Sequence, residues 1–505
     1  MSAGYATHFG RQLRAEWTKF RTVRGWVLGL AAAVLLTVLV GAFSAQTSRA
    51  TCPGQSPDRP CTGPRSPGGQ AVTDSFFFVH QRITAHGSLT VRLTSLTGPG
   101  LPGWAKAGIL VKTGTRQGSS YAALMMTPGH GVRMQHDFTH DTAGAGGGVS
   151  AASPRWLRLT RAGATVTGYE SVDGTRWSVV GTARLTGLAD SSAPVPAGLF
   201  ATSPPTTQAS RQRFGGVGVS DRATRATGTF DHVALQDGVP GGTWRGEQIG
   251  GSVAGDAAGP PGFTEGPGGT FTVSGSGDIA PNVGGPATGG GETIERSLVG
   301  TFIGLIVVIV LGATFVTAEY RRGLIRTTFM AHPRRGGALA AKAVVIGGVT
   351  FAAALPAAAG AVLLGEWLVR PDGFVFPVAG LTQVRVVVGT ALLLALSAVL
   401  ALAVGTLLRR GVAAVTAVFV ATVVPYLLAT GSILPDGPSR WLLRLTPAAG
   451  FAVQQAVPHY AWVDSTYAPA FGYFPLSPFA GLAVLLLWTT STLLLAGRLL
   501  QRRDP

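Results

Sequence analysis

Six long apolar runs constrain the fold of this chain more than any other feature. A helix needs about 20 mostly apolar residues to cross a hydrocarbon core of roughly 30 Å. No Asp, Glu or Lys interrupts the six runs, and Arg498 stands at the end of the last one. The runs are 26–45, 298–318, 343–365, 386–408, 411–434 and 478–500. They predict an α-helical polytopic membrane protein with six transmembrane helices, the first of them retained because its apolar part is too long for a signal peptide.

The basic residues beside these runs predict the orientation. One set of flanking segments holds 16 of the chain's 40 Lys and Arg against three acids, and Lys and Arg accumulate in cytoplasmic loops. These segments are 1–25, 319–342, 409–410 and 498–505. The short loops of the other side, 366–385 and 435–477, have as many acids as bases. Both termini, including the tail 501–505, are therefore expected in the cytoplasm, with the chain in the plasma membrane. The preference for Arg over Lys indicates a bacterium with a high-GC genome.

The net charge of +17 does not point to nucleic acid in such a chain. The 16 flanking basic residues are expected beside anionic lipid, which attracts them. The bilayer is thus the first predicted partner, and no nucleic acid is expected to bind.

About 250 residues separate the first two runs, and most of them predict an all-β domain. Residues 72–237 alternate apolar and polar positions in short segments between turn signals such as Asp173-Gly174. This pattern predicts an extracellular sandwich or jelly roll. Residues 238–297 are rich in Gly and Pro, which favours a partly ordered tether. The alternative is an extra hairpin that completes the sheet, formed around 269–277.

The linker 46–71 contains the chain's two cysteines, Cys52 and Cys61. On the oxidising side of the membrane they predict a small disulfide-closed loop. Intermolecular pairing is the alternative.

Several motifs of the β region resemble extracellular laminin-G-like, concanavalin-type jelly rolls, including the DUF1349 group. The matching segments are 103–108 (GWAKAG), 121–122 (YA), 127–129 (TPG), 154–161 (PRWLRLTR) and 171–177 (SVDGTRW). The resemblance implies a binding or packing module, often for glycans, and it transfers no ligand residue to this chain.

The sequence gives little indication of a catalytic site. His130, His136, Asp137, His140 and Asp141 form the densest polar cluster. If they belong to one strand, alternation separates the later two His from the two Asp, so a solvated strand end is favoured over a metal site. No Gly-x-x-x-x-Gly-Lys motif followed by Ser or Thr is present. We expect no enzyme activity, cofactor or metal in this chain.

The N-terminal segment 1–25 predicts an amphipathic helix. Phe9, Leu13, Trp17 and Phe20 recur at helical spacing, with basic residues around the rest of the helix. Such a helix lies in the membrane interface with its aromatic side chains in lipid. The alternative is a charge cluster that only sets topology.

The loop 319–342 is the most cationic connection in the chain. Glu319 is its one acid, and its basic residues and helix-ending proline are Arg321, Arg322, Arg326, Pro333, Arg334, Arg335 and Lys342. A short helix that stops at the proline suits insertion into a groove on a partner protein. Binding to lipid headgroups is the alternative.

The helical parts resemble the permease subunits of ABC-2 type ATP-binding-cassette transporters of actinobacterial type. The matching segments are 16–21 (EWTKFR), 317–328 (TAEYRRGLIRTT), 333–335 (PRR), 340–342 (AAK) and 445–450 (LTPAAG). The resemblance implies a homodimer or heterodimer of six-helix units on a separate cytosolic ATPase, coupled through 319–335. Spans without buried charge favour export of an amphiphilic or lipid-like substrate.

The long insertion departs from the short loop usual in that family. It is expected to bind a ligand, with a glycan as the class that the jelly roll implies, or to gate the exit. A membrane-embedded glycan sensor or adhesion protein without transport activity is the alternative function.

Overall fold

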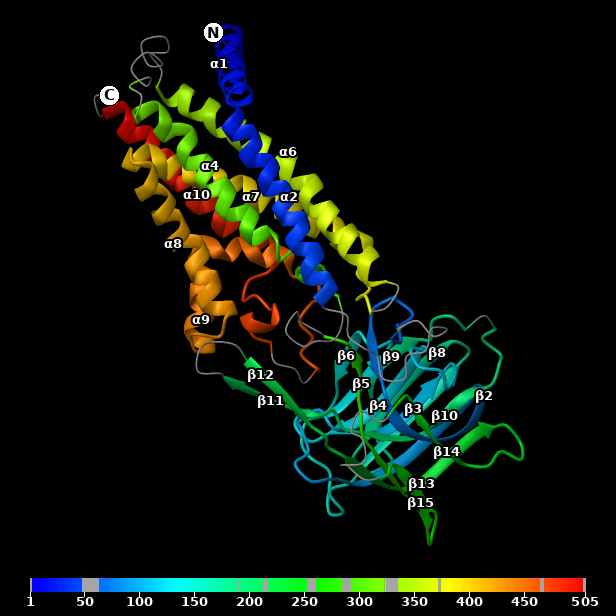
Figure 1. The fold of residues 1–505 in the computed structure, drawn as a ribbon. Coiled ribbons are helices and arrows are strands. Elements are labelled where there is room, and N and C mark those ends of the chain that lie inside the picture. The colour runs from blue at the N-terminus through cyan, green and yellow to red at the C-terminus, as the bar shows by residue number, and fades with distance from the viewer. Residues whose placement is uncertain are drawn as a thin grey trace.

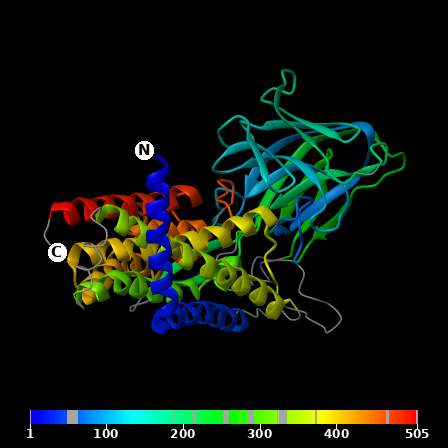
Figure 2. The ribbon, with the colours of Figure 1, turned by 90° about the horizontal axis from the view of Figure 1, so that it is seen from above.

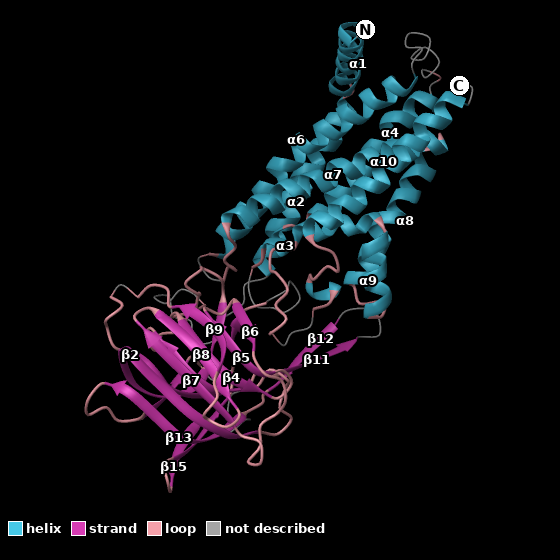
Figure 3. Cartoon of the chain, turned by 180° about the vertical axis from the view of Figure 1, so that it is seen from behind, coloured by secondary structure: helices cyan, strands magenta, loops and turns pink. Residues whose placement is uncertain are grey.

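The structure is a computed structural model, and it combines a bundle of long helices with a large antiparallel β-domain (Figure 1). It describes residues 2–47, 63–188, 190–211, 217–251, 260–283, 292–321, 323, 335–370, 374–463 and 467–502. The N- and C-terminal ends lie at one end of the bundle, which we call the terminal end (Figures 1 and 3). The β-domain lies at the opposite end, which we call the β-domain end.

Six helices in the described part of the chain are long and apolar enough to cross a membrane. They are α2 (Arg24–Thr47), α4 (Thr301–Arg321), α6 (Arg335–Val369), α7 (Gly380–Leu408), α8 (Gly411–Thr430) and α10 (Pro478–Arg502). Each overlaps one predicted run. Helix α7 is the most buried of them and packs against α4, α6 and α10. Glycine allows the closest approach, because a Cβ on Gly312 of α4 would lie 2.2 Å from the Ala398 carbonyl oxygen of α7.

Helix α1 (Ser2–Thr22) precedes the bundle and runs across it rather than along it (Figure 2). It contacts the first turns of α6 and the start of α2. A short helix, α3 (Ile294–Ser297), stands before α4 at the β-domain end, with the Thr293 side chain accepting from the Arg296 amide.

The segment after α8 differs from the plain loop predicted for 435–477. It forms the amphipathic helix α9 (Asp436–Leu445), the 3-10 helix η3 (Pro447–Gln454) and a short turn, η4 (Pro469–Phe471). All eight residues of η3 are buried, against α7 and α10. Glycine allows η3 to approach α10 this closely, because a Cβ on Gly481 of α10 would lie 2.2 Å from the Ala449 carbonyl oxygen of η3. The segment therefore returns into the bundle.

The β-domain is a sandwich of two sheets that share one long strand, β2 (Phe76–Thr97). Residues 76–83 of β2 pair with β10 and β14, and residues 88–97 pair with β7 and β13. Every paired ladder is antiparallel. The other strands are β1 (Val72–Asp74), β3 (Lys106–Lys112), β4 (Tyr121–Thr127), β5 (Gly131–His136), β6 (His140–Ala143), β7 (Arg155–Ala162), β8 (Thr165–Ser171), β9 (Ser178–Arg184), β10 (Val195–Thr202), β11 (Thr206–Arg211), β12 (Val217–Arg222), β13 (Ala226–Gly238), β14 (Arg245–Ile249), β15 (Gly262–Gly266), β16 (Thr270–Gly275) and β17 (Ile279–Pro281).

Apolar side chains from both sheets form the main core of this sandwich, as alternation predicts. Val79, Ile109 and Leu124 of one sheet meet Leu157 and Val166 of the other. The β-domain also extends into 238–297, where a tether was favoured. The β15–β16 hairpin pairs with β13, and β17 pairs with β1, so this part completes the β-domain.

Candidate functional site

Four charged side chains from three helices meet at the terminal end of the bundle. Lys342 Nζ of α6 donates to Glu16 Oε2 of α1 at 2.8 Å and to Glu319 Oε1 of α4 at 2.6 Å. Lys19 Nζ of α1 donates to Glu16 Oε1 at 2.9 Å and to Glu319 Oε1 at 3.1 Å. We call these four residues the ion cluster. It joins residues that lie 326 positions apart in the chain.

The ion cluster is largely withdrawn from solvent. The side chains of Lys342, Glu16 and Glu319 are 3%, 6% and 9% exposed, and that of Lys19 is 41% exposed. Buried charges are tolerated when they are paired and hydrogen-bonded, and here two acids balance two bases. Burial acts to lower the pKa of Lys19, but hydrogen bonds and charges from Glu16 and Glu319 outweigh it and raise that pKa.

Aromatic side chains beside the ion cluster pack α1 against the bundle. Phe20 lies 6.2 Å from Phe315 of α4 and 6.2 Å from Trp26, between ring centroids. The Lys342 ammonium lies 5.3 Å from the centroid of the Phe315 ring, within cation–π range. The inner face of α1 is therefore held by both charge and apolar packing.

This packing corrects the predicted lipid-facing role of Leu13 and Phe20, whereas that of Phe9 and Trp17 stays a prediction. Phe20 is 4% exposed and Leu13 packs against the bundle core, so these two face the protein. Phe9 is half-buried, and Trp17 is 47% exposed. The reason is that Glu16 shares the face of Phe20 and Leu13, and its partner Lys342 belongs to the bundle.

The ion cluster holds both ends of the cationic loop. Glu319 lies in the last turn of α4 and Lys342 in the second turn of α6, so the loop leaves and returns at one point. Arg321 is exposed, and Arg335 donates from Nη1 to the Leu500 carbonyl of α10 at 3.0 Å. The remaining predicted coupling residues, Arg322, Arg326, Pro333 and Arg334, lie outside the described residues.

Sequence reasoning nominated Glu319 but did not single out Glu16, Lys19 or Lys342 as a site. One signal was available, because the chain has only four lysines among its 40 Lys and Arg. Two of them are in the ion cluster, and the other two, Lys106 and Lys112, form buried ion pairs in the β-domain.

The polar cluster of the β-domain is not organised as one site. His136 and His140 face each other across the β5–β6 hairpin with stacked rings 4.2 Å apart, so the assumption of a single strand was wrong. Asp137 accepts from Ser120 and Thr186, while Asp141 pairs with Arg133. In the parts of the chain that the structure describes, no three His, Cys, Asp or Glu side chains converge on a metal position. Both cysteines of the predicted disulfide lie outside the described residues.

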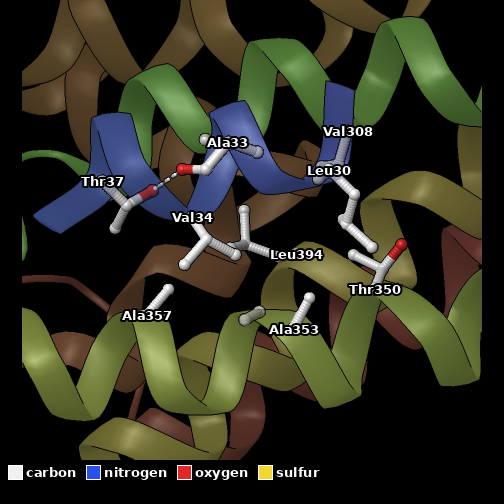
Figure 4. Close-up of a pocket in the computed structure, with 11 residues that line it drawn as sticks. Leu30, Ala33, Val34, Thr37, Val308, Thr350, Ala353, Ala357 and Leu394 are labelled. Atoms are coloured by element: carbon white, nitrogen blue, oxygen red, sulfur yellow. Dashed lines mark hydrogen bonds between the residues drawn. The ribbon is translucent and has the colours of Figure 1, made fainter. Parts of the chain in front are cut away.

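A small apolar pocket opens between α2, α4, α6 and α7 (Figure 4). Leu30, Ala33 and Val34 of α2 face Ala353 and Ala357 of α6. The remaining lining residues are Thr37, Gly304, Val308, Thr350, Ala354 and Leu394. No charged side chain lines the pocket, and the Thr37 hydroxyl is already bonded to the Ala33 carbonyl at 2.8 Å. Its lining is almost wholly apolar, and its internal space is too small for more than about one water molecule.

Comparison with known proteins assigns this chain to no family. No family model matches the chain, and no curated protein matches it. The three solved structures named next align with TM-scores of 0.25 or less, which carry no functional argument. A GH43 protein from Bacillus licheniformis aligns at 15% identity and TM-score 0.18, over 23% of this chain and 24% of its own. Scytalido-glutamic peptidase aligns at 8% identity and TM-score 0.25, over 42% of this chain and 100% of its own. A functionally unknown protein from Saccharomyces cerevisiae aligns at 18% identity and TM-score 0.20, over 36% of this chain and 85% of its own.

Proposed function

We propose that this chain is the membrane-spanning permease subunit of an ATP-driven transporter of the ABC-2 type. The observation that carries the proposal is the ion cluster. It ties Glu319 and Lys342, at the two ends of the cationic loop, to Glu16 and Lys19 of α1. A force applied to the loop by a cytosolic ATPase would therefore reach α1, α4 and α6 together.

The two ends of the molecule support this assignment. The terminal end carries the exposed Arg321 and the described ends of the cationic loop, which fits a cytoplasmic face under the positive-inside rule. The β-domain at the opposite end is then extracellular, where it binds a ligand or gates the exit. ATP hydrolysis belongs to the partner chain, and a second permease unit completes a dimer.

The substrate that fits best is amphiphilic or lipid-like, moved outward. No Asp, Glu or Lys stands within the six apolar runs, which disfavours a hydrophilic ion pathway. An ion would need polar groups to replace its hydration shell.

Co-purification tests the proposal. The detergent-solubilised wild-type chain is purified from its host beside a triple variant, Arg321→Glu, Arg322→Glu and Arg326→Glu. The matched control is Arg176→Glu, a substitution of an exposed arginine in the β-domain. We expect an ATPase to accompany the wild type and the control but not the triple variant. Absence of any ATPase, or its retention by the triple variant, would overturn the docking role and favour a glycan sensor or adhesion protein.

A further inference from the structure

The chain joins the β-domain to the bundle through two segments that pair with each other. The inbound connector, 63–75, leads from the direction of α2, and the outbound connector, 276–283, leads toward α3. Their strands β1 and β17 are antiparallel, with Val72 opposite Pro281 and Asp74 opposite Ile279. Any motion of one connector is therefore imposed on the other.

Two buried lysines fix these connectors to one strand of the sandwich. Lys106 Nζ donates to Asp278 Oδ1 at 2.5 Å and to the Ile279 carbonyl at 2.9 Å. Lys112 Nζ donates to Asp74 Oδ2 at 2.7 Å and to the Ser119 carbonyl at 2.9 Å. The two lysines are the first and last residues of β3, and their even spacing places both on the same face of the sheet.

The surroundings of Lys112 make this attachment specific. Its side chain and that of Asp74 are fully buried, and its ammonium lies 5.5 Å from the ring centroids of Tyr121 and Phe138. Asp74 Oδ2 also accepts from the Gly118 amide at 2.7 Å. An ammonium enclosed in this way is stable only while the inbound connector supplies its carboxylate.

The bundle holds the same parts of the β-domain from the other side. Val283, at the end of the outbound connector, packs with Phe471 and Tyr473 of the segment that follows η3. Trp462 donates from its indole nitrogen to the Phe138 carbonyl at 3.3 Å. Phe138 thus contacts both Lys112 in the β-domain and Trp462 in the bundle.

We propose that Lys106 and Lys112 are positioning residues that fasten both connectors to β3, so that the β-domain moves as one body with the β-domain end of the bundle. We call this arrangement of the two lysines and their aspartates the clamp. It rests on the proposed function only because that function makes the β-domain end the exit for the substrate. Within that function, rearrangement at the β-domain end of the bundle displaces the β-domain through the contacts of Val283 and Phe138 with the segment that follows η3.

Pulsed electron paramagnetic resonance tests the clamp in the full chain. Spin labels are placed on cysteines at Arg176, in an exposed turn of the β-domain, and at Leu381, 88% exposed at the start of α7. The background carries Cys52→Ser and Cys61→Ser. The variant is Lys106→Met with Lys112→Met. The control is Arg92→Met, which breaks the ion pair of Arg92 with Asp231 of β13, in the sheet that does not contain β3. We expect the width of the distance distribution to at least double in the variant and to stay unchanged in the control.

Hydrogen exchange of β7 and β8 in the same samples shows whether the sandwich stays folded. If the double Met variant loses this protection, Asp74→Asn with Asp278→Asn carries the same test, because it removes the charges of the connectors without changing their shape. An unchanged width in a folded variant, or equal broadening in the control, would overturn the clamp. No ATPase is needed, so this result is independent of the capture experiment.

Discussion

Three of this chain's four lysines are buried, each beside a carboxylate. The chain has four lysines, and Lys19, Lys342, Lys106 and Lys112 each form an ion pair. A lysine ammonium on its flexible stem can reach two carboxylates at once, as Lys342 does with Glu16 and Glu319. These pairs join distant segments, which is why the pairing itself could not be predicted from a single sequence.

Lys342 and Lys19 provide a matched comparison within the ion cluster. Lys342→Met leaves two buried carboxylates with one partner, and we expect a loss of about 3–5 kcal/mol in the free energy of unfolding. Lys19→Met removes a half-exposed partner, and we expect about 1 kcal/mol or less. Thermal unfolding of the two purified variants in detergent measures the difference. Equal losses would show that Lys342 is not the centre of the cluster.

The β5–β6 hairpin is predicted to be sensitive to acid. Burial, followed by the neighbouring His140, lowers the pKa of His136 below its usual 6.5. The unfolded chain then binds more protons than the folded one below about pH 6.5, so stability falls as the pH drops through that value. Hydrogen exchange of 131–143 at pH 7.5 and pH 5, corrected for intrinsic rates, should show weaker protection at pH 5. A His136→Gln variant should lose this dependence, and its persistence would assign the effect to another group.

At the scale of elements, local patterns predicted most of the fold. Hydropathy located the six helices because each is a continuous apolar run, and alternation located strands such as β7 and β8 because their turns are local. Two features escaped this reasoning. Strands β14, β16 and β17 are short, and each pairs with a strand that lies farther back in the sequence, namely β2, β13 and β1. Helix η3 has only eight residues, too few for a span, and its burial depends on tertiary packing.

Substitutions at two glycines of α10 test how tightly η3 packs against that helix. A Cβ on Gly481 would lie 2.2 Å from the Ala449 carbonyl oxygen, whereas a Cβ on Gly497 meets no atom within 4 Å. Gly481→Ala should therefore cost about 1–3 kcal/mol of stability by overpacking. Gly497→Ala should be neutral or stabilising by about 1 kcal/mol, because Ala favours helix. Thermal unfolding compares the two, and a neutral Gly481→Ala would mean that η3 can move away from α10.

At the scale of the whole molecule, buried lysine ion pairs occur in two places, the terminal end of the bundle and the connectors of the β-domain. The ion cluster joins α1, α4 and α6 at the terminal end, and the Lys106 and Lys112 pairs hold the connectors at the β-domain end. Between them run helices without charged side chains at their centres. In the proposed permease, a movement that begins at the cationic loop would pass along these helices toward the β-domain end of the bundle.

The most direct test of this account places a photo-crosslinking amino acid at Arg321, the exposed residue at the start of the cationic loop, in living cells. The matched control places it at Trp441, 58% exposed on α9 at the β-domain end. We predict that position 321 forms an adduct with a cytosolic protein that carries a phosphate-binding Gly-x-x-x-x-Gly-Lys motif, and that position 441 does not. If position 321 captures no such ATPase, or position 441 captures it equally, the assignment of this chain as an ATP-coupled permease is contradicted.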